Sequence, residues 1–299
     1  MISTESPIGA SRMEEAATGC LRRYLTRYAA DPAPWRRYDV RRSDAGHVDG
    51  RFDLVTEVER PREVHVDAQL PVNPRDSGSE ATRWGSLVHA LLELHARLAL
   101  DPGFAPDPWR LQDLAENLDL PSAMSFLAQV AARDPLGDVG LRLVGGLEEV
   151  LWMPDPVHCQ RLDALAVDSH GALWAVDYKT TGPWAPKQTW TRSFQMAGFD
   201  ALGHANFGPR WGGVAVVELV GDNKRQLVRT LTFRLRGFDR AAFVASLRAG
   251  QARVEAALEA VEAGRVQSPS ELPGLYGGDC VSWGRPCPAV DVCHPAWGL

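Results

Sequence analysis

The sequence lacks several features, and each absence excludes a class of protein. It contains no run of about 18 or more apolar residues, so we expect no transmembrane helix. Its first residues, Met1 to Pro7, hold no basic segment followed by an apolar one, so we expect no signal peptide and a cytoplasmic location. In that compartment the 5 cysteines among the 299 residues are not expected to form structural disulfides.

Positive charge is also scarce. The chain has 32 Lys and Arg residues against 38 Asp and Glu residues, which gives a formal net charge of -6. This balance argues against a protein that coats nucleic acid without specificity, although it allows a local basic groove. Hydrophobic residues make up 45% of the chain and charged residues 23%, within the globular range, and the length suits one large domain or two small ones.

The most informative stretch that is present, Arg161–Lys179, predicts a β-hairpin. Two apolar runs flank a turn at Gly171, whose freedom to adopt positive φ suits a tight connection. Side chains alternate along a strand, so Asp177 and Lys179 point to the same side, and Asp163 on the first strand lies across from them. Two carboxylates and an ammonium then converge, an arrangement that can bind Mg²⁺ and orient water. The alternative is an ordinary Asp–Lys ion pair on the surface.

Two predicted helices flank this hairpin in the sequence. The first spans 82–100 and has a broad apolar face. His89 lies on it and is either a packed core residue or a metal ligand through a neutral imidazole. Gly85, one turn earlier, allows another backbone or a phosphate to come close. The second helix spans 187–204 and carries Gln195.

In their order along the chain, these motifs resemble the RecB-type branch of the PD-(D/E)XK nuclease superfamily. That branch carries a helical His, an Asp on a strand, an Asp/Glu-x-Lys on the next strand and Gln-x-x-x-Tyr on the following helix. The resemblance covers residues 82 to 235. Two positions depart from the pattern, because Phe199 stands where the family has Tyr and Gln160 stands where many members have Gly.

The resemblance implies an α/β fold with a restriction-endonuclease-like core, in which helices flank a mixed β-sheet. It also implies a DNA nuclease that depends on Mg²⁺ or Mn²⁺, and more narrowly an exonuclease that hydrolyses phosphodiester bonds at DNA ends in recombination, repair or defence. The competing hypothesis is a nuclease-fold module that binds DNA within a larger complex and cleaves weakly or not at all. By resemblance, the catalytic residues are Asp163, Asp177, Lys179 and Gln195, and the metal ligands are His89, Asp163, Asp177 and the backbone carbonyl of Tyr178.

Several further residues are candidates for contact with single-stranded or double-stranded DNA. Arg22 and Arg23, on a helix predicted over 11–28, are placed to meet phosphates, unless they form a solvated helix face. Thr180 and Thr181 can donate hydroxyls to a phosphate. Trp184 can stack on an unpaired base or cover the core. No ATPase phosphate-binding loop is present, so unwinding of DNA is expected to need a helicase or recombinase partner.

The cysteines form a second pattern. Cys280, Cys287 and Cys293 lie in a tail rich in Gly, Pro and Trp, with six and five residues between them, and Cys20 lies on the first helix. This set resembles the iron–sulfur nucleases of the AddB type and of CRISPR adaptation, and it implies a [4Fe–4S] cluster that joins the first helix to the tail. The spacing between Cys280 and Cys287 is longer than the Cys-x2-Cys of those proteins. Zinc and a set of unrelated thiols are the alternatives.

The sequence therefore predicts four segments. These are an N-terminal helix with the first cluster cysteine (1–30), an irregular or β insertion of unknown role (31–80), the nuclease core (81–265) and the cysteine-rich tail (266–299). The further elements expected are strands at 52–58 and 64–70, one or two helices over 109–133 interrupted at Pro121, a strand at 141–153, a second hairpin formed by 213–220 and 227–233, and a long helix over 238–264.

Overall fold

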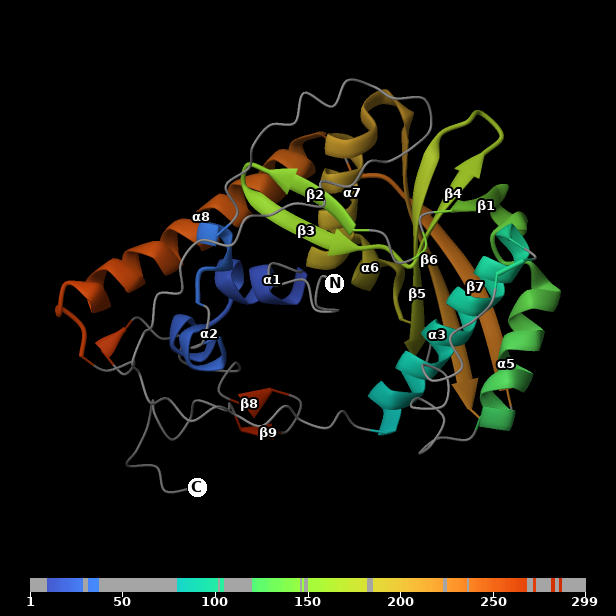
Figure 1. Cartoon of the computed structure of the whole chain (residues 1–299), viewed down its shortest axis with the longest axis horizontal. Coiled ribbons are helices and arrows are strands. Elements are labelled where there is room, and N and C mark those ends of the chain that lie inside the picture. Colours follow the sequence, from blue (N-terminus) through green and yellow to red (C-terminus); the bar gives the residue numbers. More distant parts are fainter. Residues whose placement is uncertain are drawn as a thin grey trace. The chain divides into compact units, whose positions relative to one another are not determined.

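The computed structural model describes the chain in ranges that are separated by gaps. These are residues 10–28, 32–37, 80–101, 103–104, 120–145, 147, 150–181, 185–222, 225–235, 237–267, 271–272, 281–282 and 285–286. The chain divides into two compact units, whose elements are labelled in Figure 1. Unit 1 comprises 1–73, 154–158 and 245–299, and unit 2 comprises 74–153 and 159–244.

Unit 2 is built on a five-stranded sheet with the order β1-β4-β5-β6-β7. Its strands are β1 (Leu141–Gly145), β4 (Ala164–Asp168), β5 (Leu173–Thr181), β6 (Trp211–Asp222) and β7 (Arg225–Phe233). The β5–β6 pair is parallel and the other neighbours are antiparallel. Parallel pairing needs a crossover, which α6 (Lys187–Thr191) and α7 (Phe194–Phe207) supply. The predicted α/β class with a mixed sheet is confirmed.

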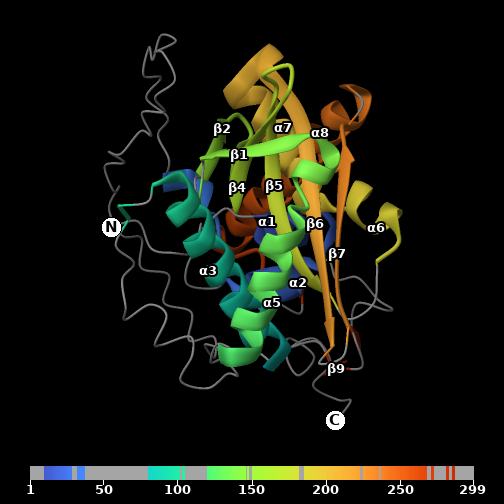
Figure 2. The ribbon, with the colours of Figure 1, turned by 90° about the vertical axis from the view of Figure 1, so that its right-hand side faces the viewer.

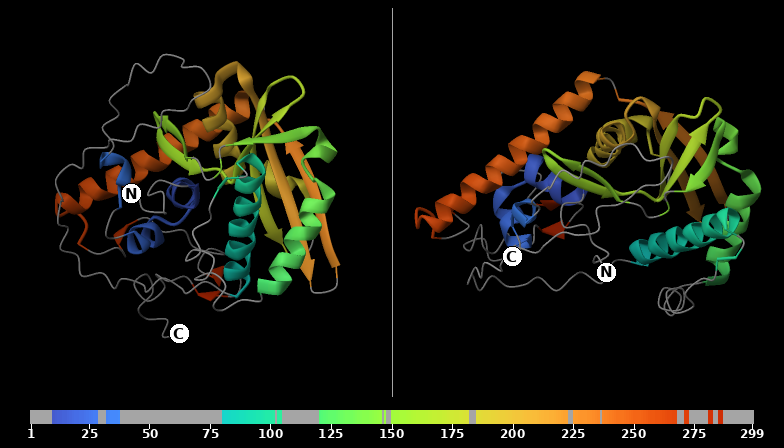
Figure 3. Two further views of the ribbon diagram at one scale, coloured as in Figure 1. Left: turned by 45° about the vertical axis from the view of Figure 1, so that its right-hand side comes forward. Right: turned by 45° about the horizontal axis from the view of Figure 1, so that its top comes forward.

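Helices cover both faces of this sheet. Figures 2 and 3 show α3 (Glu80–Leu100) and α5 (Leu120–Arg133) against one face, and α7 lies against the other. Because side chains alternate across a strand, Tyr178 of β5 faces α3, whereas Asp177 and Lys179 face α7. The core under α3 and α5 is formed by buried side chains from the helices and sheet, among them Val88, Leu92, Val130, Ala164, Ala166, Val176, Ala215, Val217 and Leu219.

Local sequence signals are sufficient for several of the elements. The hairpin of β4 and β5 is confirmed, and so is the long helix α3 that carries His89. The second hairpin, β6–β7, is confirmed with longer strands, and the last long helix is α8 (Gly237–Glu262). No helix in the described ranges is long and apolar enough to span a membrane.

Three expected elements are each divided in the structure. The helix expected over 11–28 is two helices, α1 (Ala10–Thr18) and α2 (Leu21–Arg27), and the helix expected over 187–204 is α6 and α7. In both cases an extended residue separates the halves, Cys20 in the first and Ser193 in the second. The strand expected over 141–153 ends at Gly145, whose φ of 143° does not continue a regular strand.

The residues beyond that break belong to a different sheet. β2 (Val150–Pro154) pairs with β3 (Val157–Arg161) in a two-stranded sheet of its own, outside the five-stranded one. Over 109–133, the described helix is α5, and Pro121 lies in its first turn, where a missing N–H costs no hydrogen bond. The strands expected at 52–58 and 64–70 lie outside the described residues.

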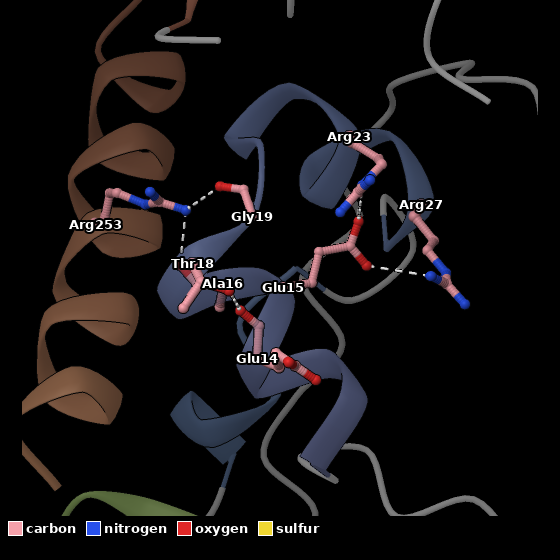
Figure 4. A network of polar contacts seen from close by, with 8 residues as sticks. All are labelled: Glu14, Glu15, Ala16, Thr18, Gly19, Arg23, Arg27 and Arg253. Atoms are coloured by element: carbon pink, nitrogen blue, oxygen red, sulfur yellow. Dashed lines mark hydrogen bonds and ion pairs between the residues drawn. The ribbon is translucent and has the colours of Figure 1, made fainter. Parts of the chain in front are cut away.

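In unit 1, α1 and α2 are held by side chains that bind backbone carbonyls. Figure 4 shows Arg253 of α8, whose Nη2 donates to the carbonyl oxygens of Ala16 at 2.8 Å and Gly19 at 2.7 Å. These are carbonyls at the end of α1 that have no partner within the helix. A Cβ at Gly250 would lie 2.8 Å from Ala17 Cα, so α8 approaches α1 closely at this point. The unit also contains a 3-10 turn, Pro34–Arg37, and the short strands β8 (Val281–Ser282) and β9 (Arg285–Pro286).

Candidate active site

The two predicted carboxylates occupy adjacent parts of unit 2 but different local structures. Asp177 lies within β5 and is 2% exposed. Asp163 was expected on the first strand of the hairpin, and it lies instead at the bend just before β4 begins at Ala164. Its Oδ2 accepts a hydrogen bond of 2.7 Å from the backbone N–H of Tyr178. The side chain of Asp163 therefore binds the strand that carries Asp177.

Lys179 and Gln195 both contact Asp177. Lys179 Nζ lies 3.1 Å from Asp177 Oδ1 and 2.9 Å from its Oδ2, as expected for two residues that share one face of a strand. Gln195, on the first turn of α7, donates from Nε2 to Asp177 Oδ1 at 3.3 Å. Two of the predicted catalytic side chains are thus within hydrogen-bond distance of a third, Asp177.

His89 reaches the same place from α3. Its Nδ1 lies 3.3 Å from Asp163 Oδ1, and its ring meets the buried ring of Tyr178 edge to face, with the centroids 6.4 Å apart. Close approach of α3 to β5 depends on Gly85, because a Cβ there would lie 3.0 Å from Thr180 Oγ1. Gly85 was expected to admit another backbone or a phosphate, and the group that the structure describes beside it is instead the side chain of Thr180.

The cluster carries more negative than positive charge when His89 is neutral, and the pKa values reflect this. Burial raises the pKa of Asp177 to about 6, since the charge of Lys179 lowers it only in part and Asp163 adds repulsion. Burial also acts to raise the pKa of Asp163, but His89 and the Tyr178 N–H outweigh it and hold the pKa low. Burial lowers the pKa of Lys179. The charge and hydrogen bond of Asp177, together with the charge of Asp163, outweigh burial, so the pKa is raised overall.

The neighbouring carboxylates also change the pKa of His89. Burial lowers the pKa of His89, but the hydrogen bond and charge of Asp163 outweigh this effect and raise the pKa overall. A protonated imidazole cannot bind a metal, so His89 must lose its proton before it could act as a ligand. When Nδ1–H donates to Asp163, the lone pair of Nε2 remains available.

The donor set fits a hard divalent cation in chemical kind. Carboxylates are the ligands that such ions prefer, and an imidazole is a common ligand of transition-metal ions. Burial is the main cause of the raised pKa of Asp177, and repulsion from Asp163 adds to it. Within the ranges that the structure describes, no three His, Cys, Asp or Glu side chains lie close enough to hold a metal ion. In this arrangement Asp177 is directed to Lys179, and Asp163 to His89 and the Tyr178 N–H.

The residues predicted to contact DNA lie in several places. Thr180 and Thr181 end β5 beside the cluster, and Thr181 Oγ1 is buried with no hydrogen-bond partner among the described residues. Arg22 and Arg23 lie in unit 1, where Arg22 Nε donates to the Leu272 carbonyl at 2.7 Å and Arg23 Nε forms an ion pair with Glu15 at 2.6 Å. Trp184 lies outside the described residues.

The predicted iron–sulfur ligands are described only in part. Cys20 is 8% exposed and occupies the extended position between α1 and α2. Neither its thiol nor that of the buried Cys159 forms a disulfide among the described residues. Cys280, Cys287 and Cys293 lie outside the described residues, so a cysteine cluster stays a prediction.

One feature beside the cluster was missed by the sequence analysis. Glu218 is fully buried in β6, and its register partner on β5 is Lys179. An isolated charge within the apolar run from Val214 to Val220 is the signal that marks it, because a buried carboxylate needs a partner. That partner is Arg229, directly opposite on β7.

Comparisons with known proteins find distant likeness among solved structures only. No family model matches the sequence. No curated protein matches it. Among solved structures, a crystal structure of a protein from Eubacterium rectale, provisionally named an exonuclease, is similar with a TM-score of 0.41 and 13% sequence identity, over 65% of this chain and 71% of that one. Similarity at this level shows neither a family nor an activity for this chain.

Proposed function

We propose that the chain is a metal-dependent deoxyribonuclease whose active site is formed by His89, Asp163, Asp177, Lys179 and Gln195. The observation that supports it best is the convergence of these side chains from four separate segments of unit 2. They are the residues that the RecB-type motifs select, in the same order along the chain. A surface ion pair would not need a buried Asp that is bound by both Lys and Gln.

Each residue has a role in hydrolysis of a phosphodiester. Asp163, Asp177 and His89 would hold Mg²⁺ or Mn²⁺, which when bound polarises the scissile phosphate and lowers the pKa of water. Lys179 orients the attacking water or stabilises the charge that develops on the phosphate oxygens. Gln195 holds the carboxylate to which Lys179 is bound, and so fixes the position of the ammonium.

The backbone of Tyr178 is a further proposed ligand. In a strand, the N–H and C=O of one residue point to the same side, and the Tyr178 N–H points to Asp163. The carbonyl of Tyr178 is therefore directed toward the edge of β5 at which Asp163 lies. Pairing of β5 with β4 ends at Val176 in the described structure, so β4 does not use that carbonyl.

Phosphate contacts and base stacking would give little sequence preference, which suits an exonuclease acting at DNA ends. Thr180 and Thr181, at the end of β5, are further proposed contacts to the DNA strand. A helicase or recombinase partner would supply unwinding. A [4Fe–4S] cluster on Cys20 and the three tail cysteines is proposed as a structural cofactor, and it is tested by visible absorbance with iron and sulfide content after anaerobic purification.

The function is tested by digestion of end-labelled linear DNA, single- and double-stranded, beside closed circular DNA, with Mg²⁺ or Mn²⁺. Wild type is compared with Lys179→Met and with Lys187→Met, an exposed lysine in α6. We expect Lys179→Met to lower kcat by about 10²- to 10⁴-fold and Lys187→Met to match wild type. Loss of linear DNA alone supports an exonuclease. Binding of DNA without cleavage by wild type would favour the binding-module hypothesis instead.

A further inference from the structure

A second buried ion pair lies beside the proposed active site and has no part in the roles assigned above. Glu218 has no solvent exposure, and Arg229 Nε donates to its Oε2. Its Oε1 accepts a hydrogen bond of 3.1 Å from the N–H of Ala185. Arg229 Nη2 also donates to the carbonyl of Ala185. Both carboxylate oxygens of Glu218 are therefore engaged, and its charge is neutralised by one guanidinium.

The register of the sheet places this pair next to Lys179. In the parallel pairing of β5 with β6, Lys179 is opposite Glu218, and residues opposite each other on neighbouring strands point to the same face. That face is the one on which Lys179 contacts Asp177. Lys179 thus has a buried carboxylate as its neighbour along β5 and another as its neighbour across to β6.

The ammonium of Lys179 is bound to only one of these carboxylates. A lysine side chain is long and flexible, whereas a buried carboxylate without a cation is strongly unfavourable. If Glu218 lacked Arg229, the most direct way to compensate its charge would be for Lys179 to turn toward it. We propose that Arg229 is a positioning residue for Lys179: by neutralising Glu218, it keeps the ammonium on Asp177 at the site of hydrolysis. This inference rests on the proposed nuclease function.

The experiment compares kcat, KM and calorimetric Mn²⁺ affinity for wild type, Arg229→Gln, Glu218→Gln and the double variant. For Arg229→Gln we expect kcat to fall about tenfold or more, because small displacements of a catalytic group are costly. Mn²⁺ affinity should be kept or become tighter, because Asp177 is released from Lys179. Glu218→Gln and the double variant remove the competing charge, so both should retain a kcat close to that of wild type.

The matched control is Arg240→Gln. Arg240 forms an ion pair with the buried Asp200 at 3.2 Å in the same unit, so its loss also strands a buried carboxylate, but one that is not the register partner of Lys179. It should lower stability and leave kcat per folded molecule unchanged.

The outcomes separate the inference from the function on which it rests. A folded Arg229→Gln with lowered kcat, beside active Glu218→Gln and double variants, supports the positioning role, whereas a folded Arg229→Gln with the kcat of wild type would overturn it. A folded double variant with kcat as low as that of Arg229→Gln, or a folded Glu218→Gln that is inactive, would overturn it, because the pair would then be needed as a structural clamp on Ala185. Parallel loss of kcat and Mn²⁺ binding in Arg229→Gln would also overturn it. Absence of cleavage by wild type would overturn the proposed function, and the inference with it.

Discussion

Asp163 accepts a 2.7 Å hydrogen bond from the backbone N–H of Tyr178, and this bond stands where strand pairing would otherwise continue. The last residue pair of the β4–β5 ladder is Ala164 with Val176, so Asp163 lies one residue before the ladder and Tyr178 two residues beyond it. The carboxylate thus satisfies a backbone donor and is fixed against the strand that carries Asp177. Two carboxylates are brought together by the way in which the hairpin ends.

Metal binding should stabilise the folded protein, because a cation that binds the native site alone shifts the unfolding equilibrium. At a concentration about 100 times Kd, the gain is about 2.7 kcal/mol, which corresponds to roughly 4 °C in Tm for a chain of this size. We expect Mn²⁺ to raise the Tm of wild type and to have no effect on Asp163→Asn.

Asp168→Asn is the matched control for that experiment. Asp168 lies at the other end of the same hairpin, where it binds the Trp174 indole N–H at 3.1 Å and two backbone N–H groups. Its loss should lower the Tm but leave the Mn²⁺ shift in place. An equal shift in Asp163→Asn would show that the ion binds elsewhere.

The raised pKa of Asp177 predicts a pH dependence for the metal-free protein. The folded protein binds this proton with a pKa of about 6, and the unfolded chain binds it near the ordinary value of about 4. Because the folded state holds the proton more tightly, the contribution to stability falls as the pH rises from about 4 to about 6. The raised pKa of His89 acts in the same direction over a higher range.

Asp177→Asn removes the titrating carboxylate and isolates its effect. In EDTA, the difference in unfolding free energy between the variant and wild type should shift in favour of the variant by about 1–3 kcal/mol between pH 4.5 and 7. Urea unfolding at the two pH values measures this difference. A pH-independent difference would mean that Asp177 is not held in an unfavourable ionised state.

The sequence predicts the parts of this site that depend on neighbouring residues in the chain. Apolar alternation and the turn at Gly171 are local, so the hairpin and the common side of Asp177 and Lys179 are predicted correctly. The apolar face of the helix that carries His89 is also predicted from residues that are close together in the sequence. By contrast, the sequence does not predict the interruptions of the helices at Cys20 and Ser193, because the apolar pattern continues through both positions.

The remaining features depend on which strands become neighbours, and this is not encoded locally. That β5 pairs in parallel with β6, in a register that sets Lys179 beside Glu218, follows from the crossover through α7. That Arg229 lies opposite Glu218 follows from the register of the second hairpin. A pattern of apolar residues gives the strands but not this pairing, so the ion pair beside the site was not predicted.

Gly85 and Thr180 should be energetically coupled, because a Cβ at Gly85 would lie 3.0 Å from Thr180 Oγ1. Ala is favoured over Gly by about 1 kcal/mol within a helix. In a Thr180→Ala background we therefore expect Gly85→Ala to stabilise the protein by about 1 kcal/mol. With Thr180 present, the crowding should remove at least about half of that gain. Equal effects in both backgrounds, measured by urea unfolding, would contradict a close contact between α3 and β5.

The contact between Gln160 and Gly198 joins the segment before Asp163 to the helix that carries Gln195. A Cβ at Gly198 would lie 1.8 Å from Gln160 Nε2 and 2.7 Å from its Cδ. Gln160 is only 3% exposed, so its amide cannot move out into solvent without disturbing the core. We expect Gly198→Ala to destabilise the protein by about 1–3 kcal/mol, as overpacking does.

Removal of the opposing side chain should relieve that strain. The double variant Gly198→Ala with Gln160→Ala is expected to recover most of the lost stability, and with it the Mn²⁺-dependent rise in Tm. Gly203 provides the control on the same helix, since a Cβ there meets Trp211 at 2.2 Å instead. Gln160→Ala should not relieve Gly203→Ala, because the two side chains that collide are different. If Gln160→Ala restored the stability of both variants equally, it would act by a general change in core packing. A specific contact between Gln160 and Gly198 of α7 would then be refuted.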